Sequence, residues 1–200
     1  MQLRRRVVAG FTLIELMVSI FIITLVLTMG IPYMGDWVRR ASVRTAAESI
    51  QNGLRVAQQE AIRRNTPVEF ALVQSVPLAS DAATASLATK TNDWKGWMVR
   101  VRSDNSFVQG DNVAANAGDA ELTSSDIKNN ILRFSGFGQV RNSDDAVLSS
   151  TMVYRVASPK VSEVRCVLVT PGASVRMCDP SVASSDPRGC GAAADACPLN

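Results

Sequence analysis

Hydrophobic residues follow two successive patterns in the first third of the chain. Residues 7–35 are almost entirely apolar, and Glu15 is their only charged residue. Further on, apolar residues recur every three or four positions, at Val43, Ala47, Ile50, Leu54, Ala57 and Ala61. That spacing places them on one face of a helix. The two segments together predict one helix over residues 11–64, which ends before Pro67 because proline cannot continue a helix.

Beyond Pro67 the pattern changes to short runs of β-branched and aromatic residues separated by turns. The predicted strands are residues 68–76, 97–102, 131–134, 152–156 and 164–170. Segments 79–91 and 110–125 are rich in small and polar residues and are predicted to be exposed loops. The expected fold is α+β, with the second half of the long helix packed on an antiparallel β-sheet head.

Composition argues against an enzyme. The 200 residues allow one good hydrophobic core, and the net charge of +3 is accounted for by Arg4, Arg5 and Arg6. The absence of histidine removes the usual catalytic triads and most zinc sites, and the acidic residues of segment 104–145 show no catalytic spacing. We therefore predict no catalytic residue, no metal and no cofactor. Trp94 and Trp97 are predicted to pack in the core rather than to form a ligand platform.

The apolar N-terminal run is long enough to cross a bilayer. About 20 apolar residues span the hydrocarbon layer as a helix, and residues 16–35 meet that length. The competing interpretation is a signal peptide, but no small-residue cleavage site stands out at residues 29–35. The arginines that precede the run place the N-terminus in the cytoplasm, so we expect an inner-membrane anchor with a periplasmic head.

All four cysteines, Cys166, Cys178, Cys190 and Cys197, lie in the last fifth of the chain. Disulfides are favoured over a zinc site, because the sequence has neither a CxxC pair nor a histidine. Four cysteines allow three pairings. Two strands around a turn at residues 171–173 would place Cys166 opposite Cys178, which predicts a bond between these two and leaves Cys190 with Cys197.

Glu15 is the most informative single residue. A carboxylate within an apolar helix is costly, so it indicates a functional role with a partner of opposite charge. The alternative on physical grounds alone is that Glu15 lies at the level of the lipid headgroups.

The residues around this carboxylate form the run Gly10-Phe11-Thr12-Leu13-Ile14-Glu15-Leu16 after a short basic leader. This run closely resembles the prepilin cleavage and methylation motif. The resemblance implies that a membrane prepilin peptidase cuts after Gly10 and that Phe11 becomes N-methylated. It also implies that Glu15 pairs with the amine of Phe11 on a neighbouring subunit, which would make it an assembly residue.

This resemblance divides the chain into four predicted parts. Residues 1–10 are the leader and residues 11–35 the transmembrane and assembly helix. Residues 36–66 form the amphipathic helix, and residues 67–200 form the head with a disulfide-containing tail.

Several later segments resemble the FimT and GspH group of minor pilins and pseudopilins. They are Ala57-Gln58-Gln59-Glu60-Ala61-Ile62-Arg63-Arg64-Asn65, Trp94-Lys95-Gly96-Trp97, residues 131–138 and Val175-Arg176-Met177-Cys178. The resemblance implies a minor subunit that joins other pilins in a type IV pilus and supports motility, adhesion or DNA uptake. A pseudopilin of a type II secretion system is the alternative.

A third possibility is a DNA receptor for natural transformation. Some FimT-type pilins carry a C-terminal Gly-Arg-x-Arg arrangement whose arginines bind phosphates. Only Arg176 of this chain matches it, while Arg165 and Arg188 could enlarge a basic patch. Because Asp179 and Asp186 lie among these arginines, DNA binding is expected to be absent or marginal.

Overall fold

The computed structural model describes residues 11–75, 79–83, 85, 87, 94–124 and 131–198. The predicted leader, including Gly10, lies outside these residues. The chain divides into two compact units, Met1–Trp37 and Val38–Asn200.

The first unit contains the beginning of helix α1 (Leu13–Arg64). The hydroxyl of Thr12 caps this helix, since the Glu15 backbone N–H donates to Thr12 Oγ1 at 3.3 Å. Large apolar side chains between Leu13 and Leu27 are exposed around the helix, as is Phe11. Within the described ranges, no helix is both long and apolar enough to cross a membrane.

The second unit begins with the remaining part of α1, whose apolar stripe is buried as predicted. Val43, Ile50 and Leu54 are fully inaccessible to solvent. The helix ends where Asn65 adopts a left-handed conformation with φ of 50°, and the Thr66 N–H donates to the carbonyl of Ala61 at 3.3 Å. The predicted helix of residues 11–64 is thus confirmed to within two residues at its start.

The strands form two antiparallel sheets, whereas the sequence indicated a single sheet. Sheet A has the spatial order β3 (Phe107–Asp111), β2 (Gly96–Val101), β1 (Val68–Val73), β5 (Ile131–Phe134) and β6 (Val140–Arg141). Sheet B has the order β4 (Glu121–Ser124), β7 (Met152–Ser158), β8 (Val161–Val169) and β9 (Val175–Cys178).

Segment 110–125, predicted to be an exposed loop, contains the end of β3, a short helix α2 (Val113–Ala117) and strand β4. Helix α2 and strand β4 are only five and four residues long, so they carry almost no periodic signal of their own. In the described part of segment 79–91, residues Ala79–Asp81 form a 3₁₀ helix, η1.

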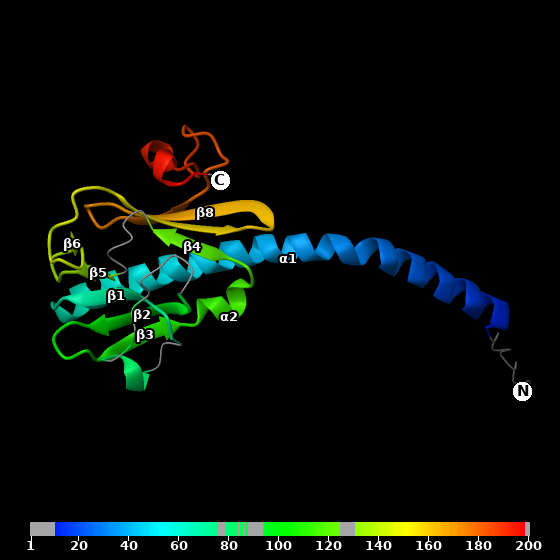
Figure 1. Cartoon of the computed structure of the whole chain (residues 1–200), viewed down its shortest axis with the longest axis horizontal. Helices are drawn as coiled ribbons and strands as arrows, with labels where there is room; N and C mark the ends of the chain where they lie inside the picture. Colours follow the sequence, from blue (N-terminus) through cyan, green and yellow to red (C-terminus); the bar gives the residue numbers. More distant parts are fainter. Residues whose placement is uncertain are drawn as a thin grey trace, which may run out of the picture. The chain divides into compact units, whose positions relative to one another are not determined.

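One hydrophobic core joins α1 to the inner faces of both sheets. Figure 1 shows the last turns of α1 running between the strands of the two sheets. Alternating residues contribute from each strand, for example Phe70 of β1 and Tyr154 of β7, whose rings meet edge to face with centroids 6.1 Å apart. Trp97 and Trp94 are both buried, which confirms their predicted packing role.

The outer faces of the sheets are covered differently. On sheet A, the buried carboxylate of Glu69 accepts from Arg100 Nε at 3.1 Å and from Arg133 Nε at 2.8 Å. On sheet B, a second apolar cluster forms between the strands and the C-terminal tail, which follows β9 and contains the 3₁₀ helix η2 (Gly191–Ala196). Figure 1 shows this tail, in red, beyond β8 on the side away from α1. The tail is therefore the outer layer of sheet B.

Candidate functional site

The first candidate site is the start of α1, where the processing and assembly residues were predicted. Phe11 and Glu15 are both exposed. Within the described part of the chain, the Glu15 carboxylate has no cation beside it, and only its backbone groups form hydrogen bonds, to Thr12 and Ser19. An unpaired carboxylate among exposed apolar side chains is a group that gains from a partner outside the chain.

The second candidate site is the C-terminal region, which begins with the hairpin of β8 and β9. The Thr170 N–H donates to the carbonyl of Ser174 at 3.0 Å, and Ala173 occupies the turn with φ of 62°. The register places Cys166 directly opposite Cys178. The predicted three-residue turn and the predicted register are both confirmed.

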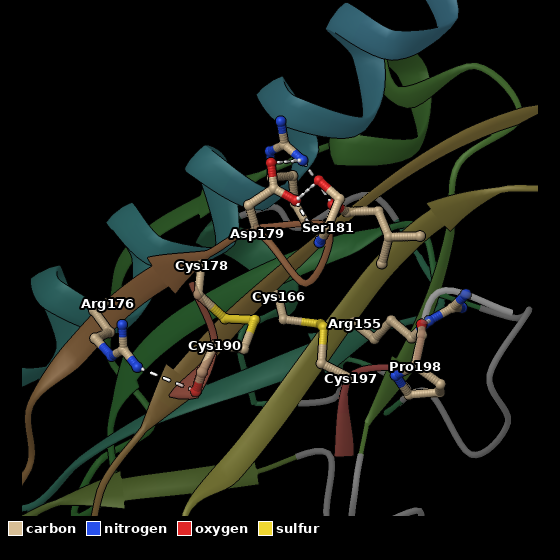
Figure 2. The surroundings of a disulfide bond; sticks show 11 residues. Arg155, Cys166, Arg176, Cys178, Asp179, Ser181, Cys190, Cys197 and Pro198 are labelled. Atoms are coloured by element: carbon tan, nitrogen blue, oxygen red, sulfur yellow. Dashed lines mark hydrogen bonds and ion pairs between the residues drawn. A yellow bond between two sulfur atoms is a disulfide. The ribbon is translucent and has the colours of Figure 1, made fainter. Parts of the chain in front are cut away.

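The predicted disulfide pairing is nevertheless wrong. Cys166 is bonded to Cys197, and Cys178 is bonded to Cys190, with Cα separations of 6.3 and 5.0 Å. Figure 2 shows each strand cysteine reaching across to the tail rather than to its neighbour on the next strand. The two bonds therefore attach the tail to two adjacent strands.

The hydrogen-bond alternation along the hairpin makes a bond between Cys166 and Cys178 less favourable than direct opposition alone suggests, without excluding it. Thr170 and Ser174 form a hydrogen-bonded pair, and pair types alternate, so Cys166 and Cys178, four residues further along, are of the same type. Side chains of such pairs lie farther apart than those of the intervening pairs. Both cysteines face the outer side of sheet B, where the tail supplies nearer partners.

Two arginines hold the tail on the sheet through its backbone carbonyls. Arg176 of β9 donates to Gly189 O at 3.1 Å and to Cys190 O at 3.3 Å, and Arg155 of β7 donates to Pro198 O at 2.7 Å. Figure 2 shows Arg176 and Arg155 on opposite sides of the two disulfides. Arg176 therefore holds the tail at residues 189–190, and Arg155 holds it at Pro198.

Side chains of α1 occupy the free edge of β9. Gln51, with Oε1 directed toward the strand, accepts from the Met177 N–H at 3.0 Å. Arg55 Nη2 donates to Val175 O at 3.4 Å, and Gln58 Nε2 donates to Ala173 O at 3.1 Å. Two of the backbone groups that an outer strand would use, the Met177 N–H and the Val175 carbonyl, are therefore bonded to the helix.

The arginines considered for DNA binding are all engaged within the chain. Arg165 pairs with Glu163 at 2.6 Å and with Asp179 at 2.8 Å, while Arg188 pairs with Asp186 at 3.0 Å. The hydrogen bond from Arg188 lowers the pKa of the Asp186 carboxyl, which keeps this acidic neighbour ionised.

A pocket of about 410 Å³ brings some of these arginines together. Arg165 and Arg188 line it together with Arg44 of α1, whereas Arg176 is not among its lining residues. Arg44 is itself paired with Glu48 at 2.9 Å. The three predicted arginines therefore do not form one cationic surface. Across the described ranges, no group of Cys, Asp and Glu residues is arranged to hold a metal ion.

Sequence reasoning missed the residues that dock the tail and cap β9. Gln51, Arg55 and Gln58 stand at helical spacing beside the apolar stripe, so their shared face was readable from the sequence. The strand edge that they meet lies more than 100 residues away, and no local pattern identifies it. The contacts of Arg155 and Arg176 likewise depend on where the tail folds.

Comparison with known proteins agrees with this architecture. Residues 5–31 match the prokaryotic N-terminal methylation motif. In structure, the chain is similar to the type IV minor pilin FimU of Pseudomonas aeruginosa, with a TM-score of 0.52 and 13% identity over 77% of this chain and 98% of that one. A second crystal form of FimU gives a TM-score of 0.47 at the same identity, covering 74% and 98% of the two chains. No curated protein matches the sequence significantly.

The family model described as type II transport protein GspH matches residues 46–181, which include the last third of α1, both sheets and the start of the tail. Since this match extends over more than half of the sequence, the chain belongs to the GspH family and carries the N-terminal methylation motif of prokaryotic prepilins.

Proposed function

We propose that this chain is a minor type IV pilin. Its precursor is held in the inner membrane by the N-terminal helix, is cut after Gly10 by prepilin peptidase and joins other pilins in a filament at the cell surface. The observation that carries the proposal is an apolar helix start, exposed on all sides and containing a single carboxylate, within a matched methylation motif.

The exposed apolar side chains at the start of α1 support burial in an assembly. Phe11, Leu13 and Phe21 are 84, 78 and 68% exposed, and the other large apolar residues up to Leu27 are 47 to 70% exposed. Apolar area in contact with water costs about 25 cal/mol per Å², so this surface is stable only against lipid or other apolar helices. A filament core of such helices supplies that environment after the subunit leaves the membrane.

Glu15 gives the assembly a register. A lone carboxylate in an apolar core costs several kcal/mol, and a neighbouring amine offsets much of that cost. The amine of Phe11, created by cleavage after Gly10, is the cation that the motif provides. Each subunit would then be fixed axially by pairing Glu15 with the N-terminus of the next.

A pseudopilin of a type II secretion system is the second candidate, and the description of the matched family favours it. Both roles use the same helix and the same processing. They differ in the filament that contains the subunit: recovery from sheared surface pili supports the pilin role, whereas recovery only with secretion pseudopili supports the second.

DNA reception is not part of this proposal. The ion pairs of Arg165 and Arg188 and the carbonyl contacts of Arg176 occupy the guanidinium groups that would bind phosphates. A titration of the protein with duplex DNA at low and physiological salt tests this point. Micromolar binding that collapses in Arg176→Ala would add a receptor role.

Glu15→Gln tests the assembly mechanism. We expect normal membrane insertion, since the helix becomes less polar, and a several-fold loss of the subunit from purified filaments. Glu121→Gln, at an exposed position of strand β4, is the matched control and should assemble normally. Mass spectrometry of the filament subunit should find methylated Phe11 at its N-terminus. Normal incorporation of Glu15→Gln, or an intact leader in filaments, would contradict the proposal.

A further inference from the structure

The four cysteines form one buried group on the outer face of sheet B. All four belong to the same apolar cluster, and each is at most 2% exposed. Cys166 and Cys178 face each other across the β8–β9 hairpin, while Cys190 and Cys197 flank η2 in the tail. Besides the native pairing, the cysteines can form a hairpin pairing, Cys166–Cys178 with Cys190–Cys197. The second bond of the hairpin pairing requires η2 to unfold, because a 3₁₀ helix rises about 2 Å per residue and holds its two ends apart.

The hairpin pairing is geometrically accessible. Directly opposed residues of a hydrogen-bonded antiparallel pair have Cα atoms about 5.5 Å apart, which lies within the range that disulfides span. The register that brings Cys166 to Cys178 is set by a local three-residue turn, so it needs no contact with the tail. A hairpin of this kind forms within microseconds, long before thiols are oxidised.

Chain entropy also favours the hairpin pairing before the tail docks. Each pairing closes one loop of 12 residues. The second loop has 31 residues in the native pairing but only seven in the hairpin pairing. In the native pairing, the Cys178–Cys190 bond lies inside the larger loop and shortens the path that has to close to 19 residues. Since closure becomes less probable as roughly the three-halves power of loop length, the undocked chain prefers the hairpin pairing by about fivefold.

Contacts of the docked tail favour the native pairing. These are the apolar cluster around the sulfur atoms and the bonds from Arg176 and Arg155 to tail carbonyls. In the hairpin pairing the tail is closed on itself through Cys190–Cys197 and is no longer attached to the sheet. Val153 and Leu168, which the tail covers in the native pairing, would then face solvent.

We propose that this chain first oxidises to the hairpin pairing and reaches its native disulfides by thiol–disulfide isomerisation, which makes a thiol or dithiol isomerase an obligatory folding partner. The exchange is redox-neutral. A catalyst thiolate attacks Cys178 Sγ and releases the Cys166 thiolate, which attacks Cys197 Sγ and releases the Cys190 thiolate. Cys190 then attacks Cys178 Sγ, closes the second native bond and regenerates the catalyst thiolate.

Tryptic peptides distinguish the two pairings directly. Cleavage after Arg165, Arg176 and Arg188 places Cys166 and Cys178 on separate peptides and leaves Cys190 and Cys197 together on a third. The native pairing links all three peptides, whereas the hairpin pairing links two and leaves the third bridged within itself. A further cut before Asp195 separates Cys190 from Cys197 and identifies the remaining connectivity.

The test is oxidation of the reduced, denatured full chain in detergent, followed by non-reducing peptide mapping. With diamide and no free thiol, we expect the hairpin pairing as the main product. With a mixture of reduced and oxidised glutathione, the native pairing should replace it. Native pairing as the main product without any thiol would overturn the proposal.

Two variants keep the test independent of refolding yield. Cys190→Ser combined with Cys197→Ser should form the Cys166–Cys178 bond quantitatively under diamide, and two persistent free thiols would refute the proposal. Arg176→Leu should lower the native share at glutathione equilibrium several-fold. Arg188→Leu, which alters an exposed arginine paired within the tail, should leave that share unchanged. Equal native shares in both arginine variants would show that tail docking does not select the pairing.

Discussion

Gly53 determines how closely helix α1 can approach sheet A. A Cβ atom at this position would lie 2.7 Å from two ring carbons of Trp97 and 2.8 Å from Phe70. The indole cannot move aside easily, because its Nε1 donates to Ser49 Oγ at 2.8 Å and Ser49 Oγ in turn donates to the Asp111 carboxylate. The close packing of α1 on Trp97 and Phe70 therefore requires a residue without a side chain at position 53.

Replacing this glycine should destabilise the head. We expect Gly53→Ala to lower the free energy of unfolding by about 2 kcal/mol, because overpacking outweighs the better helix propensity of alanine. Gly172→Ala is the matched control: its Cβ would meet only Thr170 Oγ1 at 3.9 Å, and its φ is not positive. Urea unfolding of both variants measures the difference, and equal stabilities would show that the helix shifts to accept the methyl group.

Sequence reasoning at this scale succeeded where the signal was local. The burial of Trp97 followed from its size and apolar ring, and the helical spacing of the apolar stripe placed Val43 and Leu54 in the core. The role of Gly53 was not predicted, because within a helical pattern a glycine indicates only weak propensity. Its requirement comes from an aromatic ring 44 residues further along the chain.

At the scale of elements, α1 and β9 are joined by side chain to backbone bonds rather than by packing alone. Gln51, Arg55 and Gln58 advance along the helix by four and then three residues, while their partners on the β9 side, at 177, 175 and 173, advance by two. Four and three helical residues rise about 6 and 4.5 Å, and two strand residues rise about 6.6 Å. Successive helix side chains therefore stay close to successive outward-facing backbone groups of the strand.

Gln58→Ala tests this connection. The variant leaves the carbonyl of Ala173 without its donor, and we expect the free energy of unfolding to fall by about 1 kcal/mol. Gln59→Ala removes the same chemical group from the adjacent, exposed position and should change stability by less than about 0.5 kcal/mol. Chemical denaturation of the two variants measures the difference. Identical unfolding midpoints would show that the bond from Gln58 does not stabilise the head.

In the β8–β9 hairpin, local sequence patterns predict some features and not others. Its turn, strands and register were all predictable, because each depends on neighbouring residues. The disulfide pairing was not, since it depends on the tail folding back over the outer face of sheet B. Strand β4 and helix α2 were missed for a related reason: they are too short for a periodic signal and are stabilised by the sheet and core that receive them.

For the molecule as a whole, the two disulfides divide the stabilisation of the head unequally. In the chain-entropy description, the 31-residue loop closed by Cys166–Cys197 costs the unfolded state more entropy than the 12-residue loop closed by Cys178–Cys190. The expected contributions are about 3.7 and 2.8 kcal/mol.

Removing each bond separately should reveal this difference. We expect Cys166→Ala with Cys197→Ala to lose about 1 kcal/mol more stability than Cys178→Ala with Cys190→Ala. Guanidinium unfolding under non-reducing conditions provides the comparison. The opposite order would show that tail contacts, rather than loop length, set the contribution of each bond.

The covered edge of β9 bears on how copies of this protein can associate. A sheet that is open on both sides can recruit further chains without limit, as amyloid does. Because α1 occupies the β9 edge, sheet B can gain a strand only beside β4 and cannot propagate from both sides. When many subunits are concentrated in a growing filament, sheet B is therefore not expected to polymerise by strand pairing. The contacts that extend the filament are then made by the N-terminal helices.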